Sequence, residues 1–478
     1  MHCPFARNKK GVFLFMNSMT EGREWKQIFL FTLPIMAGQF LQQLYYTIDS
    51  IIVGRFAGDT VEACEEALAS VGTCSPLIML YIGIAMGMSA GCSIMVAQYF
   101  GAKRIEEMRK AVSTSLILIT VLGLLFSVVS IAVSGLLLEY VLKVPENYLY
   151  NAVLFFRVYS IGIVFQFIYN IAAAILRALG DSKAMLYFLL ISSALNVLLD
   201  LLFVPVLGMG VAGAALATVI AQAVSAAVSL VYMFRQYEIL RFSRSELQYH
   251  GDMGLLALKL GIPTTLQQCV ISMGHMFIQR MVNDFDTTYV GLTAAFTAGM
   301  RVESFILIPI FSFNIGLATF TGQNIGAGKL KRISTGYLET ELMACIVCVV
   351  LSVAAFFSAP FLIGLFGVTD FSLTLGVQYL SFTSRLFLIF CVYIVTNGVL
   401  QGSGDVMFTA GNTLSSLIIR TVSAYVLAYC TPIGYAAAWV SLPIGWAWSL
   451  ILAVLRYKFG PWRRKALVSS DSGEGELA

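Results

Sequence analysis

The stretch LRALGDSKAMLYFLLISSALNVLLDLLFVPVL, residues 176–207, contains the features from which the fold can be deduced. A short polar turn, LRALGD, is followed by an apolar run over 185–207, and Asn196 and Asp200 lie inside that run. A helix needs about 20 apolar residues to cross the hydrocarbon core of a bilayer. The stretch therefore predicts a membrane-spanning helix that carries an amide and a carboxylate within the membrane.

Similar apolar runs fill most of the remaining chain. Of the 478 residues 58% are hydrophobic and only 12% are charged, about half the charged share of a soluble domain. The runs are continuously apolar rather than alternating, which favours helices over a β-barrel. They lie at 28–54, 70–100, 111–137, 151–176, 185–207, 209–234, 255–283, 290–322, 335–362, 377–400, 407–430 and 433–455. We predict an all-α integral membrane protein with about 12 transmembrane helices.

The chain also repeats itself at a nearly constant offset. LRALGD at 176–181 matches LQGSGD at 400–405, 224 residues later. Three more matches occur in order, Leu33-Pro34 with Ile262-Pro263, 98–102 with 323–327 and 209–212 with 433–436, at offsets of 229, 225 and 224. Such a repeat predicts two six-helix lobes. Because each copy has six spans, an even number, the second copy enters the membrane in the same orientation as the first. The two lobes are therefore expected to be related by a pseudo-twofold axis along the membrane normal, as in several secondary transporters.

The positive charges predict how these segments are oriented. Loops and ends on one side of the membrane hold 22 Lys and Arg residues, whereas the other side holds only Arg55 and Lys143. The positive-inside rule therefore puts both termini in the cytoplasm of a multi-pass protein of the cell (inner) membrane. The expected segments are a cytoplasmic N-terminal segment (1–26), an N-lobe (27–234), a cytoplasmic connector (235–254), a C-lobe (255–457) and a cytoplasmic tail (458–478).

Several function classes are disfavoured by the composition. No basic run with interleaved aromatic residues suggests nucleic-acid binding, and three histidines nearly exclude a histidine metal site. Cys345 and Cys348 form a CxxC inside a predicted span, which we interpret as small apolar filler. No nucleophile triad or phosphate loop occurs. We expect a monomeric non-enzyme without a cofactor, whose partners are membrane lipid and a small-molecule substrate.

Polar side chains form a stripe in the first span and another in the seventh. The spacing of three and four residues places each set on one helical face: Gln39, Gln42, Tyr46 and Asp49 in the first, and Gln268, His275 and Gln279, with Ser272, in the seventh. Such faces are typical of a water- or substrate-lined cleft. Hydrogen bonds between helices, without any ligand, are the alternative. Pro34 and Pro263 predict a bend in each of these two spans.

Four polar residues of the first six spans are expected at one depth. Counting about 1.5 Å per residue from the helix ends puts Asp49, Asn196, Asp200 and Thr218 at a common level in the outer half of the membrane. Two carboxylates, an amide and a hydroxyl provide oxygen ligands for Na⁺ or a site for a proton. A polar cluster that only holds helices together is the alternative. The Gly-Asp turns at 180–181 and 404–405 are interpreted as helix stops.

Together, several stretches resemble the MATE (multidrug and toxic compound extrusion) family over about 26–455. They are LPIMAGQFLQQLYYTIDSIIVGR (33–55), ILRALGDSK (175–183), NVLLD (196–200), GVAGAALAT (210–218), RVESFILIP (301–309) and GQNIGAGK (322–329). The resemblance implies two six-helix lobes, a central cleft and export of organic cations driven by inward Na⁺ or H⁺ movement.

The resemblance also implies site residues. Prokaryotic members use an Asp on the first helix, an Asn and an Asp four apart on the fifth and a Thr on the sixth, and Asp49, Asn196, Asp200 and Thr218 match this pattern. An Asn on the fourth helix corresponds to Asn170, although its apparent depth fits poorly. Other members use a Glu in the seventh helix, which this chain lacks there, so C-lobe coupling is not expected.

Two other functions stay open. A lipid-linked oligosaccharide flippase of the same superfamily would need a strongly cationic cavity, and only Arg157, Arg280, Arg301, Arg385 and Arg420 lie in or near spans. An intramembrane enzyme would need paired acids at catalytic separation, a requirement that only Asp49 with Asp200 meets. The substrate and the choice between Na⁺ and H⁺ are not readable from the sequence.

Overall fold

Long apolar segments form helices here because a helix satisfies its backbone hydrogen bonds within the segment. The computed structural model describes residues 18–58, 60–142, 144–243, 246–286, 288–366 and 369–467, and every regular element in these ranges is helical. Lys143, residues 1–17 of the predicted N-terminal segment and residues 468–478 of the predicted tail lie outside the described residues.

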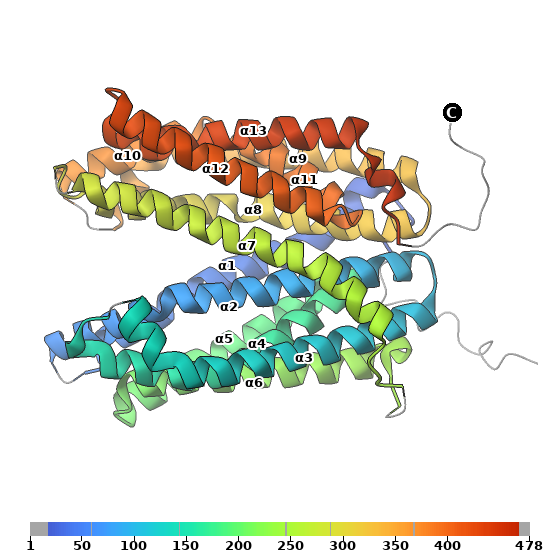
Figure 1. Cartoon of the computed structure of the whole chain (residues 1–478), viewed down its shortest axis with the longest axis horizontal. Coiled ribbons are helices and arrows are strands. Elements are labelled where there is room, and N and C mark those ends of the chain that lie inside the picture. Colours follow the sequence, from blue (N-terminus) through green and yellow to red (C-terminus); the bar gives the residue numbers. More distant parts are fainter. Residues whose placement is uncertain are drawn as a thin grey trace, which may run out of the picture. The chain divides into compact units, whose positions relative to one another are not determined.

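The described residues of the first half form six long α-helices. Figure 1 labels them α1 to α6. They are α1 (Glu24–Phe56), α2 (Val61–Gly101), α3 (Ile105–Leu136), α4 (Glu146–Ala178), α5 (Lys183–Leu201) and α6 (Gly210–Gln236), with the short helices η2 (Leu137–Val141), η3 (Leu202–Val206) and η4 (Glu238–Leu240). The first six predicted spans fall on these helices, which extend beyond several of the predicted bounds. For example, α2 begins at Val61, nine residues before the predicted start of the second span.

The described residues of the second half form seven α-helices. They are α7 (Gly251–Asp286), α8 (Leu292–Gly326), α9 (Leu330–Gly364), α10 (Asp370–Ser384), α11 (Phe387–Gly402), α12 (Val406–Cys430) and α13 (Ala437–Phe459), with η5 (Gly434–Ala436) and η6 (Pro461–Arg464). Among the described residues eleven helices are long and apolar enough to cross a membrane, or twelve spans if α10 and α11 count as one. The predicted all-α membrane fold is confirmed.

The tenth predicted span, 377–400, is not one continuous helix. It falls on α10 and α11, which are bent by 52° at Arg385–Leu386, where neither Pro nor Gly occurs. Just before the break, the Thr383 hydroxyl donates to the carbonyl of Tyr379 (3.1 Å) and the Ser384 hydroxyl donates to that of Ser381 (3.3 Å). Hydroxyl groups that bond to helix carbonyls in this way bend helices.

The described chain forms two compact units. Unit 1 includes Ala37–Phe100 and Arg104–Thr265, and unit 2 includes Met19–Met36, Gly101–Lys103 and the chain from Leu266 onward. The division therefore falls inside α1 and inside α7. The lobe boundaries expected from the repeat lie elsewhere, in the 235–254 connector, and remain a prediction.

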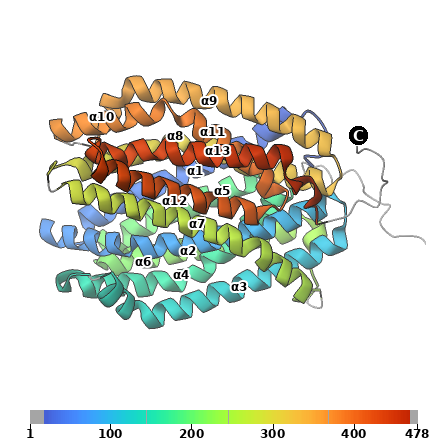
Figure 2. The ribbon, with the colours of Figure 1, turned by 45° about the horizontal axis from the view of Figure 1, so that its top comes forward.

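Helix packing follows the same pattern in each unit, in which neighbouring helices lie side by side (Figure 2). In unit 1, α4 packs against α3, α5 and α6, and α5 packs against α6. In unit 2, the α10–α11 segment packs against α9, α12 and α13, and α12 packs against α13. Each pair in the first half thus has a counterpart six spans later, in agreement with the repeat.

Small residues allow close approach between α11 and α8, and small residues also occur at the corresponding positions of α4. Gly398 and Gly402 form a GxxxG pair on α11, and a Cβ atom at Gly402 would lie 2.2 Å from the carbonyl oxygen of Ala318 on α8. Their counterparts on α4, 224 residues earlier, are Ala174 and Ala178, and the Ala174 carbonyl accepts from Ser93 of α2 (3.1 Å). Such small-residue spacing is a common packing solution between membrane helices.

The two Gly-Asp turns also correspond. Gly180 and Gly404 both have a φ of 90°, a left-handed conformation that favours glycine. Asp181 accepts hydrogen bonds from the hydroxyls of Tyr232 (3.0 Å) and Tyr237 (2.7 Å), near the end of α6. The carboxylate of Asp405 accepts two bonds from Arg456 of α13, at 2.7 and 3.2 Å. Each turn is therefore tied to the last helix of its half.

The connector between the halves is attached to α3 of unit 1. Arg109 donates to the carbonyls of Ile239 and Arg241, both at 2.9 Å, and forms an ion pair with Glu246 (3.0 Å). The backbone N–H of Ser243 and the neighbouring Arg109 lower the pKa of Glu246. The connector thus lies along the start of α3 instead of extending freely into water.

Candidate functional site

Four polar residues predicted at one depth lie close together in unit 1. Asp49 is on α1, Asn196 and Asp200 are one turn apart on α5, and Thr218 is on α6. The carboxyl groups of Asp49 and Asp200 are within hydrogen-bonding reach of each other. Asp200 is fully buried, Asn196 is 1% exposed and Thr218 is 8% exposed.

Asn196 links Asp200 to α6. In the amide orientation that satisfies both of its polar atoms, Nδ2 donates to Oδ2 of Asp200 (2.8 Å) and the amide oxygen accepts from the backbone N–H of Thr218 (3.2 Å). In the opposite orientation Nδ2 faces the Thr218 hydroxyl at 3.4 Å, which is a poorer bond. We therefore adopt the first orientation, since the hydrogen-bond network is the basis for assigning such amides. The Thr218 hydroxyl itself donates to the carbonyl of Ala214 (3.0 Å).

The carboxyl pair has unused hydrogen-bonding capacity. Oδ1 of Asp49 and Oδ1 of Asp200 are buried atoms that have no hydrogen-bond partner among the described residues. Buried polar atoms are normally paired, so an unpaired buried oxygen is a reason to consider a ligand. Two carboxyl oxygens and an amide group together can hold a shared proton or a small cation.

Two tyrosines next to this layer were missed in the sequence analysis. The Tyr45 hydroxyl is within hydrogen-bonding reach of Thr218, and both Tyr45 and Tyr159 of α4 interact electrostatically with Asp49. Tyr45 could have been found because it is four residues before Asp49 and therefore on the same helical side. Tyr159 had no such signal, since only the packing of α4 brings it near α1.

Asn170 of α4 and Gln42 of the α1 stripe each donate a hydrogen bond within their own helix. Asn170 donates to the carbonyl of Gln166 in its own helix (2.8 Å). Gln42 donates to the Tyr46 hydroxyl (3.3 Å), as expected for neighbours on one helical face, and Gln39 is partly exposed.

The polar stripe of α7 is more exposed than the polar stripe of α1. His275 is exposed, Gln268 is partly exposed, and Gln279 donates to Asn283 in its own helix (2.9 Å). Gln267, which is outside this stripe, is buried and bridges two other helices, donating to Thr413 (2.9 Å) and accepting from Gln401 (3.1 Å). Of these two adjacent glutamines, the structure gives the interhelical role to Gln267.

Unit 2 also contains a buried acid that was not selected from the sequence. Glu303 of α8 accepts a hydrogen bond from the hydroxyl of Tyr379 on α10, and Arg420 of α12 interacts electrostatically with both. Arg420 occupies the position that corresponds to Asn196, 224 residues earlier. Its Nε is buried and has no hydrogen-bond partner among the described residues. The two units thus have different chemistry at corresponding positions.

The comparison with family models agrees with the internal repeat. The MatE family model matches residues 34–202 and again residues 263–426. A relative from Bacillus subtilis, the probable multidrug resistance protein YpnP, is 30% identical over 94% of this chain and 98% of its own length. The probable multidrug resistance protein NorM of Thermotoga maritima is 21% identical over 93% of this chain and 95% of its own.

Solved structures support the same fold. The outward-facing conformation of a multidrug resistance MATE family transporter of the MOP superfamily has a TM-score of 0.85 and 24% identity, covering 96% of this chain and 99% of that one. A MATE crystal structure in the bent conformation also has a TM-score of 0.85, with 23% identity and coverage of 94% and 98%. The chain therefore belongs to the MATE family and is a multi-pass membrane transporter for multidrug efflux, not an enzyme.

Proposed function

We propose that this MATE transporter is an antiporter that exports organic, often cationic small molecules in exchange for Na⁺ or H⁺. We further propose that the layer of Asp49, Asn196, Asp200 and Thr218 is its coupling-ion site. The observation that carries this proposal is the contact between the carboxyl groups of Asp49 and Asp200, each with one buried oxygen that has no hydrogen-bond partner in the described part of the chain.

The physical argument concerns charge. Two ionised carboxylates held in contact away from water repel each other, and burial adds a large desolvation cost. A shared proton or a bound Na⁺ removes this repulsion, and either ligand would therefore favour the closed contact between α1 and α5. Release of the ligand would favour separation of the two helices.

Antiport follows if the substrate prefers the other arrangement. A ligand shifts a conformational equilibrium only through its different affinities for the two states. The ion would favour the state in which Asp49 contacts Asp200, and the substrate would favour the state in which they are apart. The polar residues Gln39, Gln42, Tyr46, Gln268, His275 and Gln279 are the candidates for lining the substrate path. The names of two relatives, a probable multidrug resistance protein and a multidrug export protein, agree with this substrate class.

Separately imposed ion gradients test the proposal. Purified protein in lipid vesicles would receive a Na⁺ gradient without a pH gradient, and then the reverse, while uptake of a fluorescent organic cation is followed. One of the two gradients should drive uptake, and Asp200→Asn should remove the dependence on it. If both gradients leave the uptake rate unchanged, the coupling proposal is wrong. Movement of a lipid-linked oligosaccharide in place of the cation would support the flippase alternative.

A further inference from the structure

Three cysteines lie together in unit 2, away from the coupling-ion layer. Cys345 and Cys348 are three residues apart on α9, and the thiol of Cys391 on α11 is within hydrogen-bonding reach of both. Cys391 is fully buried and Cys348 is 2% exposed, whereas Cys345 is only partly buried. The third thiol is 43 residues after Cys348 in the sequence, and only the packing of α11 on α9 brings it to the CxxC pair.

A carboxyl group is next to the most accessible thiol. The Cys345 thiol donates to Oε1 of Glu341, one turn earlier on α9, at 3.7 Å. The other oxygen, Oε2 of Glu341, is buried and has no hydrogen-bond partner among the described residues. Glu341 is thus placed to accept the thiol proton, and the thiolate is the reactive form of cysteine.

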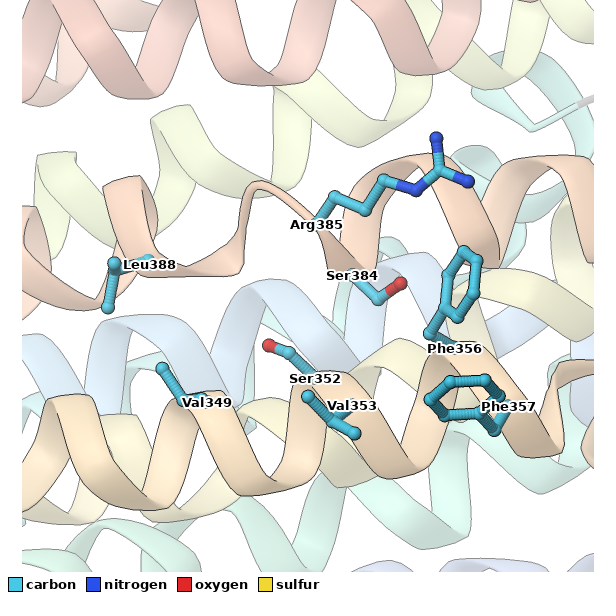
Figure 3. Close-up of a pocket in the computed structure, with 8 residues that line it drawn as sticks. All are labelled: Val349, Ser352, Val353, Phe356, Phe357, Ser384, Arg385 and Leu388. Atoms are coloured by element: carbon cyan, nitrogen blue, oxygen red, sulfur yellow. The ribbon is translucent and has the colours of Figure 1, made fainter.

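A cavity next to the cluster opens on the apolar surface of unit 2. It has a volume of about 360 Å³ and lies between α9 and the broken α10–α11 span. Figure 3 shows Ser352 on the α9 side of this cavity, with Arg385 and Leu388 on the broken span. The Ser352 hydroxyl is 3.9 Å from the Cys348 thiol. A small neutral molecule dissolved in the membrane that enters this cavity would therefore reach Ser352, whose hydroxyl is next to the Cys348 thiol.

Metal binding is the first alternative for three clustered cysteines. Among the described residues, however, no group of three or more His, Cys, Asp or Glu has a geometry that could hold a metal ion. We propose instead that these residues form an oxidation site, at which a neutral two-electron acceptor in the membrane, such as a quinone or an azo compound, converts Cys345 and Cys391 into a disulfide between α9 and α11.

The reaction balances with an azo oxidant such as diamide. Glu341 takes the proton of Cys345, the Cys345 thiolate adds to one nitrogen of the N=N bond, and the other nitrogen gains a proton. The Cys391 sulfur then attacks the Cys345 sulfur, forming the S–S bond as the S–N bond breaks. The departing hydrazine nitrogen takes the Cys391 proton. Two thiols are thus oxidised and one N=N bond is reduced to HN–NH.

The disulfide would act on the break in the tenth span. Cys391 is four residues after Phe387, where α11 begins, so it lies about one turn after the 52° bend. A covalent bond from this turn to α9 fixes the direction in which α11 leaves the break. Oxidation is therefore expected to slow any transport step that requires a change in this bend, an effect that rests on the proposed function.

Thiol mapping tests the disulfide independently of transport. Reduced protein in lipid nanodiscs would be treated with diamide, alkylated with N-ethylmaleimide and digested, and linked peptides would be identified by mass spectrometry before and after reduction. We expect a pair that joins the Cys345 and Cys391 peptides. This pair should be absent in Cys391→Ser and Cys391→Ala, and should form more slowly in Glu341→Gln. Cys92→Ser, which changes a fully buried thiol of α2, is the matched control and should behave like the unsubstituted chain.

Each outcome decides a separate point. If Cys345 and Cys391 remain fully alkylatable after diamide treatment, or if only Cys345 and Cys348 become linked, the oxidation site is wrong. If the α9–α11 disulfide forms but vesicle uptake is unchanged and insensitive to later reduction, the effect on the bend is wrong. Failure of the reduced protein to transport with either ion gradient would contradict the proposed function and leave the mapping result intact.

Discussion

At the residue scale, the two halves differ at the layer of Asp49, Asn196, Asp200 and Thr218, which is the proposed coupling-ion site. By the offsets of the sequence repeat, Asp49 corresponds to Ile278, Asp200 to Ala424 and Thr218 to Leu442. These three positions of the second half are buried apolar residues. The shared architecture can therefore be packed without carboxyl groups at this level, which favours a functional role for the acids over a structural one.

Replacing either carboxyl group of this pair by a neutral amide should distinguish a functional role from a structural one. We expect Asp49→Asn and Asp200→Asn to insert, to stay monodisperse in detergent and to lose gradient-driven efflux by at least about fivefold, the lower end of typical coupling effects. The reason is that an amide cannot exchange a proton or supply a charge for Na⁺. Efflux would be measured in vesicles at equal protein content. Near-normal efflux by Asp200→Asn would leave these residues as a polar contact between helices.

A second residue-scale prediction concerns the buried acid of unit 2. Tyr379→Phe removes the hydroxyl that donates to Glu303, and a buried acceptor without its donor costs about 1–3 kcal/mol. We expect a lower thermal unfolding temperature in detergent. Tyr337→Phe is the control, because it removes a neutral hydroxyl contact with Thr396 (3.0 Å) and should have a smaller effect. If the two substitutions lower the thermal unfolding temperature equally, the Tyr379–Glu303 hydrogen bond makes no special contribution to stability.

At the element scale, the turn before α12 should affect folding more than transport. Asp405 is 2% exposed and binds Arg456 through both oxygens, whereas an amide offers one acceptor oxygen and no charge. Hydrogen bonds to charged groups contribute about 1.5–3 kcal/mol each. Asp405→Asn should therefore lower the yield of folded protein, measured by fluorescence-detection size-exclusion chromatography, while efflux per folded molecule is largely retained. Normal yield with lost efflux would indicate a gating role for the turn.

Also at this scale, the bend of the tenth span should depend on its hydroxyl residues. Thr383→Val and Ser384→Ala remove the two side-chain bonds to helix carbonyls that precede the break. We expect straightening of the α10–α11 segment, measured as a longer distance between spin labels on either side of the break. An unchanged distance would mean that packing against α9 alone maintains the bend.

At the scale of the whole molecule, the distribution of positive charge predicts the orientation. Lys331→Cys, at the start of α9, should be protected from a membrane-impermeant thiol reagent in intact cells. Asp59→Cys, which lies outside the described residues, should be labelled from outside. These experiments require a background in which the native cysteines are unreactive. External labelling at position 331 would reverse the predicted orientation.

The sequence by itself determined the fold class, the number of spans and the repeat. Each of these depends on local composition, since an apolar run of sufficient length has to form a helix in the membrane. It also selected Asp49, Asn196, Asp200 and Thr218, because polar residues inside spans are rare and the depth of a residue in a helix can be counted.

Only the tertiary structure decided which residues meet across helices. The contacts of Tyr159 with the Asp49 layer, of Tyr379 with Glu303 and of Cys391 with the CxxC pair join segments that no local pattern relates. The bend at Arg385–Leu386 was also decided by the tertiary structure and not by the local sequence. The corresponding residues of α4, Ile161 and Gly162, lie in an unbroken helix although one of them is glycine. Local spacing determines which face of a helix a residue occupies, whereas the partner on that face depends on how the other helices pack.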